Sequence, residues 1–218
     1  MAIYLIRHGE TALNHARVVQ PPDTPLSARG IAQAERLGQR LTDAGIARIL
    51  VSDMARAQMT ADPVQTSTGA DLAVDPGLAE RNFGDHRGTP YSELMEKGLD
   101  IFAHDHEPPN GESWAAFHRR VDAAWANACQ VAAGLDGHLA VVTHGLVCHS
   151  IAARLAELPE SLRPADPYAE NGPPLRFGNT AVSILNAADD DLWRFDLFAC
   201  TEHLVGAVAD DGTSLSGI

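Results

Sequence analysis

Two arginines and two histidines occupy positions from which they could act on a phosphoryl group. Arg7 and His8 directly follow a short apolar run at the N-terminus, and Arg56 and His144 come shortly after two later apolar runs. A guanidinium forms paired hydrogen bonds with phosphate oxygens. A neutral imidazole is available as a nucleophile near neutral pH. A histidine after a strand is usually a hydrogen-bonded surface or core residue, but together these residue types could transfer a phosphoryl group through an enzyme-bound histidine.

The apolar runs before these residues have the pattern of strands buried on both faces. They span residues 2–7, 48–51 and 138–143 and are rich in Ile, Val and Leu. Ligands of open α/β sheets bind beyond the carboxyl ends of parallel strands. We therefore expect the three strand ends, with their arginine and histidine side chains, to meet at one edge of a sheet.

Helical patterns alternate with these strands. After Ser27, a good N-cap residue, apolar positions recur at helical spacing from Ile31 to Leu41, and Gly45 marks the stop. This alternation predicts one domain over residues 1–218, a three-layer α/β/α sandwich with a mostly parallel central sheet. The other expected elements are helices from 53 towards 65, 113–133 and 146–157, a strand at 72–74, and strands at 180–185 and 192–198 that form a hairpin around 189–191.

Residues 76–111 interrupt the alternation and are rich in Pro and Gly. Long irregular segments inside a compact domain usually form lids or binding loops. We expect an inserted cap region here, with a short helix near residues 91–97. Residues 8–26 and 158–178 are expected to be loops, and the tail after Glu202 is expected to be mobile.

Composition limits the classes of partner. The 218 residues include 16 Lys and Arg against 29 Asp and Glu, a net charge of −13, which argues against nucleic acids and anionic membranes as partners. No apolar run reaches the roughly 18 residues that span a bilayer, and no signal peptide is recognised. Three widely spaced cysteines, Cys129, Cys148 and Cys200, fit reduced thiols, with Cys148 packed in the core. We expect a cytoplasmic protein. Its oligomeric state stays open, and a homodimer is one of the alternatives.

Five segments, in order, resemble the motifs of the histidine phosphatase superfamily, in its phosphoglycerate mutase-like branch. A single R-H-G triplet is a weak signal, whereas five segments in the correct order are a strong one. The segments are Arg7–Thr11 with Asn14, Asp23–Gly30, Ser52–Ala61, Leu78–Glu80 with Phe83 and Gly84, and Val141–Gly145.

This resemblance implies a role for each matching residue. His8 would attack phosphorus and form a phosphohistidine, while Arg7, Arg56 and His144 would hold the phosphoryl oxygens and stabilise their developing charge. Asn14, Gln20 and the start of the helix at Gly145 would add further phosphate contacts. These assignments predict a phosphate pocket assembled from separate elements.

A poor leaving alkoxide also needs a proton, and Glu80 is the candidate donor. By family likeness it would then act as the base on the attacking water. The alternatives are that Glu80 forms an ion pair with Arg81, or that Asp85 is the acid. Gly9 would leave room for a ligand close to the backbone, and Tyr91, Leu94, Phe102 and Trp114 would line the substrate side of the pocket.

We expect the protein to hydrolyse a small-molecule phosphomonoester without a metal or an organic cofactor. The stretch 82–112 offers only Arg87 and Lys97 as cations, fewer than a mutase would use to clamp a bisphosphate. The alternatives are a cofactor-dependent phosphoglycerate mutase and a non-catalytic module that binds a phosphorylated ligand. The acidic and histidine side chains of residues 104–107 could bind a metal, but their spacing in a polar loop favours a solvated segment.

Overall fold

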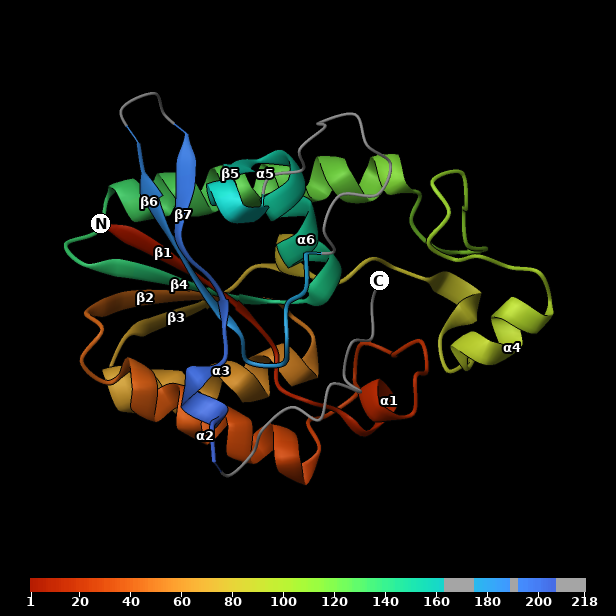
Figure 1. Ribbon diagram of the computed structural model, residues 1–218, viewed down its shortest axis with the longest axis horizontal. Helices are drawn as coiled ribbons and strands as arrows, with labels where there is room; N and C mark the ends of the chain where they lie inside the picture. The colour runs from red at the N-terminus through yellow and green to blue at the C-terminus, as the bar shows by residue number, and fades with distance from the viewer. Residues whose placement is uncertain (163–174, 189–191, 207–218) are drawn as a thin grey trace.

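The computed structural model describes residues 1–162, 175–188 and 192–206, and a seven-stranded sheet runs through its centre (Figure 1). Its strands are β1 (Ala2–Arg7), β2 (Ile46–Val51), β3 (Asp71–Val74), β4 (His138–Thr143), β5 (Ala156–Glu157), β6 (Val182–Ala187) and β7 (Trp193–Cys200). Their order is β3-β2-β4-β1-β6-β7-β5. Among these strands β6 runs antiparallel to both of its neighbours and the other pairs are parallel, so the predicted mostly parallel sheet is confirmed.

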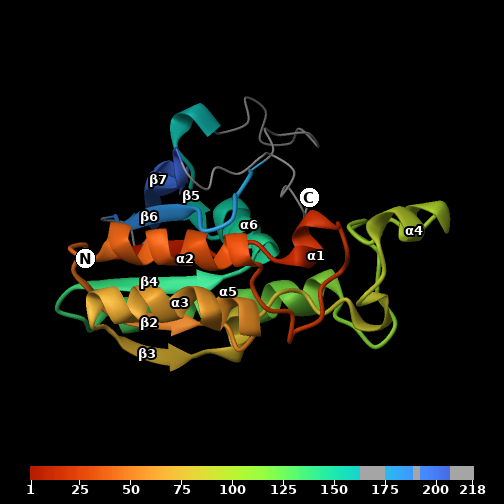
Figure 2. The same ribbon diagram turned by 90° about the horizontal axis from the view of Figure 1, so that it is seen from below.

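Helices cover both faces of the sheet. The α-helices are α1 (Ala12–His15), α2 (Ala28–Leu41), α3 (Ala55–Thr68), α4 (Tyr91–Glu96), α5 (Trp114–Ala133) and α6 (Gly145–Arg154); the 3-10 turns are η1 (Pro76–Leu78), η2 (Gly84–His86), η3 (Glu160–Leu162) and η4 (Glu202–Leu204). Figures 1 and 2 show α2 and α3 on one side of the sheet and α5 and α6 on the other. The three-layer α/β/α architecture is therefore confirmed. None of the described helices combines the length and apolarity needed to cross a membrane.

The two faces of the sheet belong to two separate apolar clusters. On β1, Ile3 and Leu5 pack in the cluster that includes Phe117 of α5, whereas Ile6 packs in the cluster that includes Leu37 of α2. Successive side chains of a strand point to opposite faces, so an almost continuous apolar run is needed when both faces are covered. Cys148 is fully buried in the first cluster, as predicted.

Helices α2 and α5 start where the sequence predicts, whereas the helix expected from 53 towards 65 runs from Ala55 to Thr68 as α3, with Pro63 inside it. The Ser27 hydroxyl accepts a hydrogen bond from the Gly30 backbone N–H (3.0 Å) at the start of α2. The Ser113 hydroxyl accepts one from Ala116 N–H (3.2 Å) at the start of α5. In this way each hydroxyl satisfies one of the N–H groups that a helix leaves without a partner.

Three expectations differ from the structure. The loop expected at 8–26 contains α1, because the side chains of Thr11 and Asn14 form a capping box. The helix expected at 146–157 ends at Arg154, and its last two residues pair with β7 as β5. At Ala156 and Glu157, hydrogen bonding to β7 replaces continuation of the helix, and no local sequence pattern predicts this pairing. The start of the supposed mobile tail forms η4, which contacts α2 through Arg40 and His203 (3.0 Å).

Some expectations fall on residues that the structure does not describe. These are the hairpin turn at 189–191, most of the Pro-rich connection at 158–178 (residues 163–174), and the tail from residue 207 to the end. The segment between β3 and α5 is described throughout. In Figure 2 it carries α4 away from the sheet, beyond α1.

Candidate active site

The parallel register brings three strand ends together, as predicted. Arg7 at the end of β1 pairs with Thr143 at the end of β4, and Val142 of β4 pairs with Val51 of β2. The residues that follow these strands therefore leave the sheet at a common edge. His8 stays attached to β4 there, because its backbone N–H donates to the Thr143 carbonyl oxygen (2.9 Å).

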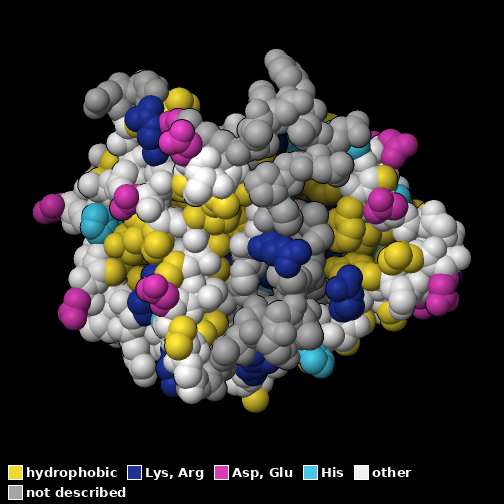
Figure 3. All heavy atoms as spheres, in the orientation of Figure 1, with side chains coloured by type: hydrophobic (Ala, Val, Ile, Leu, Met, Phe, Trp, Pro, Cys, Tyr) yellow, Lys and Arg dark blue, Asp and Glu magenta, His cyan; other side chains and the backbone are white. Residues whose placement is uncertain are grey.

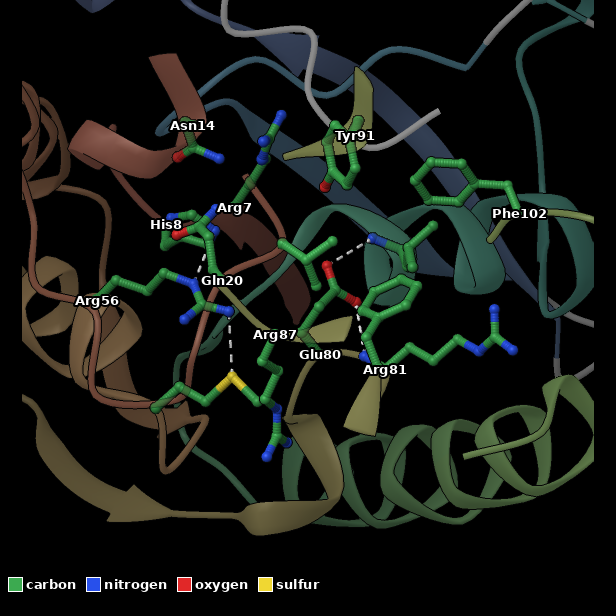
Figure 4. A pocket seen from close by; sticks show the side chains of 14 residues that line it. Arg7, His8, Asn14, Gln20, Arg56, Glu80, Arg81, Arg87, Tyr91 and Phe102 are labelled. Carbon is green, nitrogen blue, oxygen red and sulfur yellow. Dashed lines mark hydrogen bonds between the residues drawn. The ribbon is translucent and has the colours of Figure 1, made fainter. Parts of the chain in front are cut away.

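One nitrogen of His8 is fixed and the other faces an arginine. The carbonyl oxygen of Gly9 lies 2.7 Å from Nδ1. Because a carbonyl can only accept, Nδ1 carries the proton and Nε2 keeps its lone pair. Arg56 Nε donates to this Nε2 at 3.3 Å (Figure 4). Burial, followed by the positive charges of Arg56 and Arg7, holds the pKa of His8 well below its usual value, so the ring is neutral at neutral pH.

The two arginines beside His8 are themselves buried and held in place. Arg56 is 2% exposed; its Nη1 donates to the Pro21 carbonyl oxygen (3.1 Å) and its Nη2 contacts the Met54 sulfur (3.2 Å). Burial lowers its pKa to about 10, which leaves it protonated at neutral pH. Arg7 Nη1 donates to the Phe177 carbonyl oxygen. Two oriented positive charges thus lie next to the neutral imidazole.

His144 and Gly145 lie beside the cavity without lining it. The His144 ring centroid is 5.1 Å from that of His8, and its Nε2 lies 2.8 Å from the Ser52 hydroxyl oxygen. Its buried Nδ1 has no hydrogen-bond partner among the described residues. Burial lowers the pKa of His144 most strongly, and Arg56 adds to this effect. Gly145 begins α6 next to Arg7, where an added Cβ would lie 3.6 Å from Arg7 Nε.

Asn14 and Gln20 line the cavity and are organised by Thr11, a residue to which the sequence analysis assigned no role. Asn14 Oδ1 accepts from Thr11 N–H (3.1 Å), and the Thr11 hydroxyl donates to Gln20 Oε1 (2.8 Å). Both amide side chains are therefore oriented before any ligand enters.

The expectation for Gly9 was wrong. A Cβ at Gly9 would lie 2.8 Å from the Gly30 carbonyl oxygen, and one at Gly30 would lie 2.0 Å from the Glu10 carbonyl oxygen. These glycines allow the loop after β1 to pack directly on the first turn of α2. Space for backbone packing, rather than space for a ligand, explains them.

Glu80 reaches the same cavity from the segment after β3. Its Oε1 accepts from Arg81 N–H (3.0 Å) and its Oε2 accepts from Leu146 N–H (3.2 Å) (Figure 4). Burial raises its pKa and outweighs these two hydrogen bonds and the attraction of the arginines. The carboxyl group therefore holds a proton to higher pH than an exposed glutamate does.

The alternative side-chain pair between Glu80 and Arg81 does not form. The Arg81 guanidinium donates instead to the backbone carbonyl oxygens of Glu112 (3.0 Å), Ile101 (3.0 Å) and His106 (2.7 Å). Asp85, the other candidate acid, is exposed and accepts from the Asn110 side chain (3.0 Å). It does not line the cavity.

These residues enclose a small cavity of about 40 Å³. Tyr91 and Phe102 line it, as predicted, together with Phe83. Leu94 and Trp114 do not: Leu94 is buried in the core, and the Trp114 ring lies under the Arg81 guanidinium at 4.0 Å. Leu94 lies in the short helix α4 and Trp114 is the first residue of α5, and the sequence does not show which face of either helix is turned towards the cavity.

A wider groove of about 590 Å³ adjoins the small cavity. Three residues, Met54, Glu80 and Arg87, line both spaces. Glu80 therefore lies at the junction between the enclosed part of the site and its open part. A leaving group attached to a phosphoryl group in the cavity could extend into the groove.

No metal centre is formed by the described residues. Among them, no group of three or more His, Cys, Asp or Glu side chains could hold a metal ion. In the polar loop singled out for this reason, His106 Nε2 instead lies 3.2 Å from His86 Nε2, and the two rings stack.

Comparison with known proteins gives a curated relative that is named as a probable mutase and solved structures that are named as phosphatases. The curated protein named "Probable phosphoglycerate mutase GpmB" from Yersinia pestis (strain Pestoides F) is 35% identical over 166 residues, which cover 73% of this chain and 76% of that protein. A mycobacterial glucosyl-3-phosphoglycerate phosphatase solved with VO3 has a TM-score of 0.73 and 26% identity, over 90% of this chain and 98% of that chain. The alpha-ribazole phosphatase from Shigella flexneri has a TM-score of 0.75 and 27% identity, over 92% of this chain and 97% of that chain.

The family model agrees with the motifs and with the sheet edge on which they meet. The model of the histidine phosphatase superfamily (branch 1) matches residues 3–201. The chain therefore belongs to branch 1 of the histidine phosphatase superfamily.

Proposed function

We propose that this protein hydrolyses a small-molecule phosphomonoester, with His8 as the nucleophile and Glu80 as the proton donor. The observation that carries the proposal is the orientation of His8. Its Nδ1 is held by the Gly9 carbonyl oxygen, so Nε2 keeps its lone pair, which accepts from Arg56 Nε (3.3 Å), and His8 lines the same cavity as Glu80. A neutral nucleophile and a carboxyl group with a raised pKa then flank the same space.

In the first step His8 Nε2 attacks phosphorus and a P–N bond forms. The P–O bond to the leaving group breaks, its electron pair passes to the ester oxygen, and Glu80 gives its proton to that oxygen. Arg7 and Arg56 stabilise the charge on the phosphoryl oxygens that do not leave. Asn14 and Gln20 add hydrogen bonds to those oxygens.

In the second step a water molecule replaces the leaving group. Glu80, now ionised, accepts a proton from the water as its oxygen attacks phosphorus. The P–N bond breaks, its electron pair returns to His8 Nε2, and inorganic phosphate leaves. The reaction needs no metal or organic cofactor, and we expect EDTA to leave the activity of the purified protein unchanged.

The name of the 35%-identical relative supports a second candidate, a phosphoglycerate mutase. A mutase must hold a bisphosphate in two orientations, so both ends of its site need cations. Here Lys97 is exposed and forms an ion pair with Glu93 (2.7 Å), and among the two cations of the stretch 82–112 Arg87 is the one that lines the site. One cation from this stretch is fewer than a bisphosphate held in two orientations requires, and this shortage favours water as the phosphoryl acceptor. A non-catalytic binding module is the third alternative.

Phosphorus NMR of the wild type and His8→Ala, with phosphomonoesters that include 3-phosphoglycerate, separates the three alternatives. We expect wild type to release inorganic phosphate and His8→Ala to lose this activity by about 10⁴-fold or more. His104→Ala, which removes an exposed histidine, is the control.

Each alternative has its own outcome. Interconversion of 2- and 3-phosphoglycerate in the presence of a trace of 2,3-bisphosphoglycerate, with little free phosphate, would identify a mutase. Phosphate binding without turnover would identify a binding module. Equal phosphate release by wild type and His8→Ala would contradict the assigned nucleophile.

A further inference from the structure

The cavity contains more positive charge than one phosphoryl group requires. A phosphomonoester carries a charge of about −1.5 to −2 at pH 7. Arg7 and Arg56 already supply two positive charges next to His8. Arg87 is a further guanidinium that lines the cavity, and the phosphoryl group alone does not account for it.

Arg87 differs from the other cations around the segment between β3 and α5. Arg81 donates to three backbone carbonyl oxygens, Arg120 binds the Glu112 carboxylate (2.7 Å), and Lys97 pairs with Glu93. In contrast, the Arg87 guanidinium makes no hydrogen bond or ion pair with any residue in the described part of the chain. Its donors are available to a ligand.

The position of Arg87 indicates which part of a ligand it would bind. It lines both the phosphate cavity and the wider groove. Figure 4 shows its guanidinium directed away from His8 and Arg7. Glu80, the proposed proton donor to the leaving group, also borders both spaces. Arg87 therefore lies on the leaving-group side of the site.

The acidic side chains of the groove do not neutralise Arg87. Glu112 is bound to Arg120, and the Glu80 carboxyl oxygens accept from the Arg81 and Leu146 backbone N–H groups. Asp53 and Glu107 are exposed, so water and salt screen their charges. On the face drawn in Figure 3, some basic side chains lie near the centre, and others lie towards the edges together with the acidic ones. With a net charge of −13, a local cation of this kind is needed to attract an anionic leaving group.

We propose that Arg87 binds a second anionic group, carried by the leaving group of the substrate. This inference rests on the proposed phosphatase function and narrows its substrates to phosphomonoesters that bear a carboxylate or a second phosphate. Both groups have the paired oxygens that match the guanidinium. Arg87 then determines specificity, while Arg7 and Arg56 bind the phosphoryl group that is transferred.

Matched substrate pairs test this assignment. 3-Phosphoglycerate and glycerol 3-phosphate differ in one carboxylate, and fructose 1,6-bisphosphate and fructose 6-phosphate differ in one phosphate. We expect wild type to have the lower KM for the member with the additional anionic group in at least one pair. The pair that shows this preference identifies that group as a carboxylate or a phosphate. In Arg87→Gln that KM rises about 10- to 100-fold, while the KM for the other member changes less than about 3-fold.

Two further variants separate charge from structure. Arg87→Lys should retain part of the preference, because it keeps the charge and loses the paired geometry. Lys97→Gln removes one positive charge from the same segment. Because Lys97 does not line the site, this variant should change neither KM.

An equal rise of KM for both members in Arg87→Gln would overturn the proposal, because Arg87 would then bind the transferred phosphoryl group. Absence of any acidic preference in wild type would also overturn it. Calorimetry of the same substrate pairs with His8→Ala, with and without Arg87→Gln, measures the preference without turnover. Failure of the phosphatase reaction in wild type is thereby distinguished from failure of the Arg87 assignment.

Discussion

The two sides of the candidate site are held in place by different means. The sheet side consists of Arg7, the last residue of β1, and of His8, Arg56 and His144, which follow β1, β2 and β4. The insertion side consists of residues 75–113, between β3 and α5. Backbone hydrogen bonds between strands position the sheet side. Side chains that donate to backbone carbonyl oxygens position much of the insertion side.

The sheet side is enclosed by regular structure. Arg7, His8, Arg56 and His144 are all at most 4% exposed, and the strands before them are buried on both faces. Backbone pairing that continues to the Arg7–Thr143 pair leaves the side chains beyond it little freedom. The proposed phosphoryl transfer requires such a geometry, because it must be the same for every substrate.

The insertion side contains few regular elements. Arg81 joins three of its backbone carbonyl oxygens and lies against the Trp114 ring. Arg120 of α5 donates to the carbonyl oxygens of Gly77 (2.9 Å) and Ala79 (2.8 Å). A segment held by a few side chains can change in sequence without disturbing the sheet. The two sides are therefore supported separately, and under the proposed function phosphoryl transfer would belong to one side and substrate choice to the other.

Glu80 joins the two sides, and its replacement has the largest expected effect of the three variants below. Glu80→Gln removes the proposed proton donor, so kcat should fall about 10²-fold or more for an alkyl phosphate, within the range for general acid catalysis. p-Nitrophenyl phosphate, whose leaving group needs no proton, should be affected much less. Initial rates on both substrates measure the difference, with Glu96→Gln, an exposed position on α4, as the control.

The same variant should change the pH profile. Burial raises the pKa of Glu80, so the protonated acid is present below this pKa and is lost as pH rises through it. The lowered pKa of His8 keeps the nucleophile neutral into mildly acidic solution. Wild-type kcat should therefore decline on the alkaline side, and Glu80→Gln should lack that decline. An unchanged alkaline limb in the variant would assign the titration to another group.

Arg81→Met tests whether the insertion side can be loosened by itself. The change leaves three carbonyl oxygens without their donor, each at a cost of about 1 kcal/mol or more. We expect kcat/KM to fall about 10-fold and hydrogen exchange to increase in residues 76–111, while β1 and β4 stay protected. The control is Arg119→Met, an exposed arginine on α5. Equal loss of protection in the strands would show that the two sides unfold together.

Ser52→Ala is the smallest perturbation and acts on the sheet side. It removes the hydroxyl that contacts His144 Nε2 (2.8 Å) and accepts from Met54 N–H (3.2 Å). We expect a loss of about 1–2 kcal/mol in the free energy of unfolding and a decrease of only a few-fold in kcat, because the ring stays enclosed. Chemical denaturation and initial rates measure both, with exposed Ser92→Ala for comparison. A fall in kcat as large as that of Glu80→Gln would give Ser52 a larger role than support of His144.

Much of the sheet side could be predicted from local patterns. A strand that is covered on both faces is visible in the sequence as an almost continuous apolar run. Arg7 and His144 directly follow such runs. The insertion side could not be predicted in the same way. Leu94 and Trp114 were assigned to the pocket and lie elsewhere, because the sequence does not show how the helices that carry them are placed relative to the cavity.

Contacts between distant segments were also missed. Ser52 and His144 are 92 positions apart in the chain, and Arg81 and His106 are 25 positions apart. Neither pair has a local signal. The one available hint was the presence of Arg81 next to Glu80, which suggested an ion pair that does not form.

The sequence by itself determined which groups are available for phosphoryl transfer and that most of them follow buried strands, because residue type and hydrophobic periodicity are local properties. Only the tertiary structure decided the tautomer of His8, the directions of the pKa shifts of His8 and Glu80, and the availability of Arg87. These properties depend on which carbonyl oxygen, which charge and how much water surround each group. That environment is assembled from segments far apart in the chain.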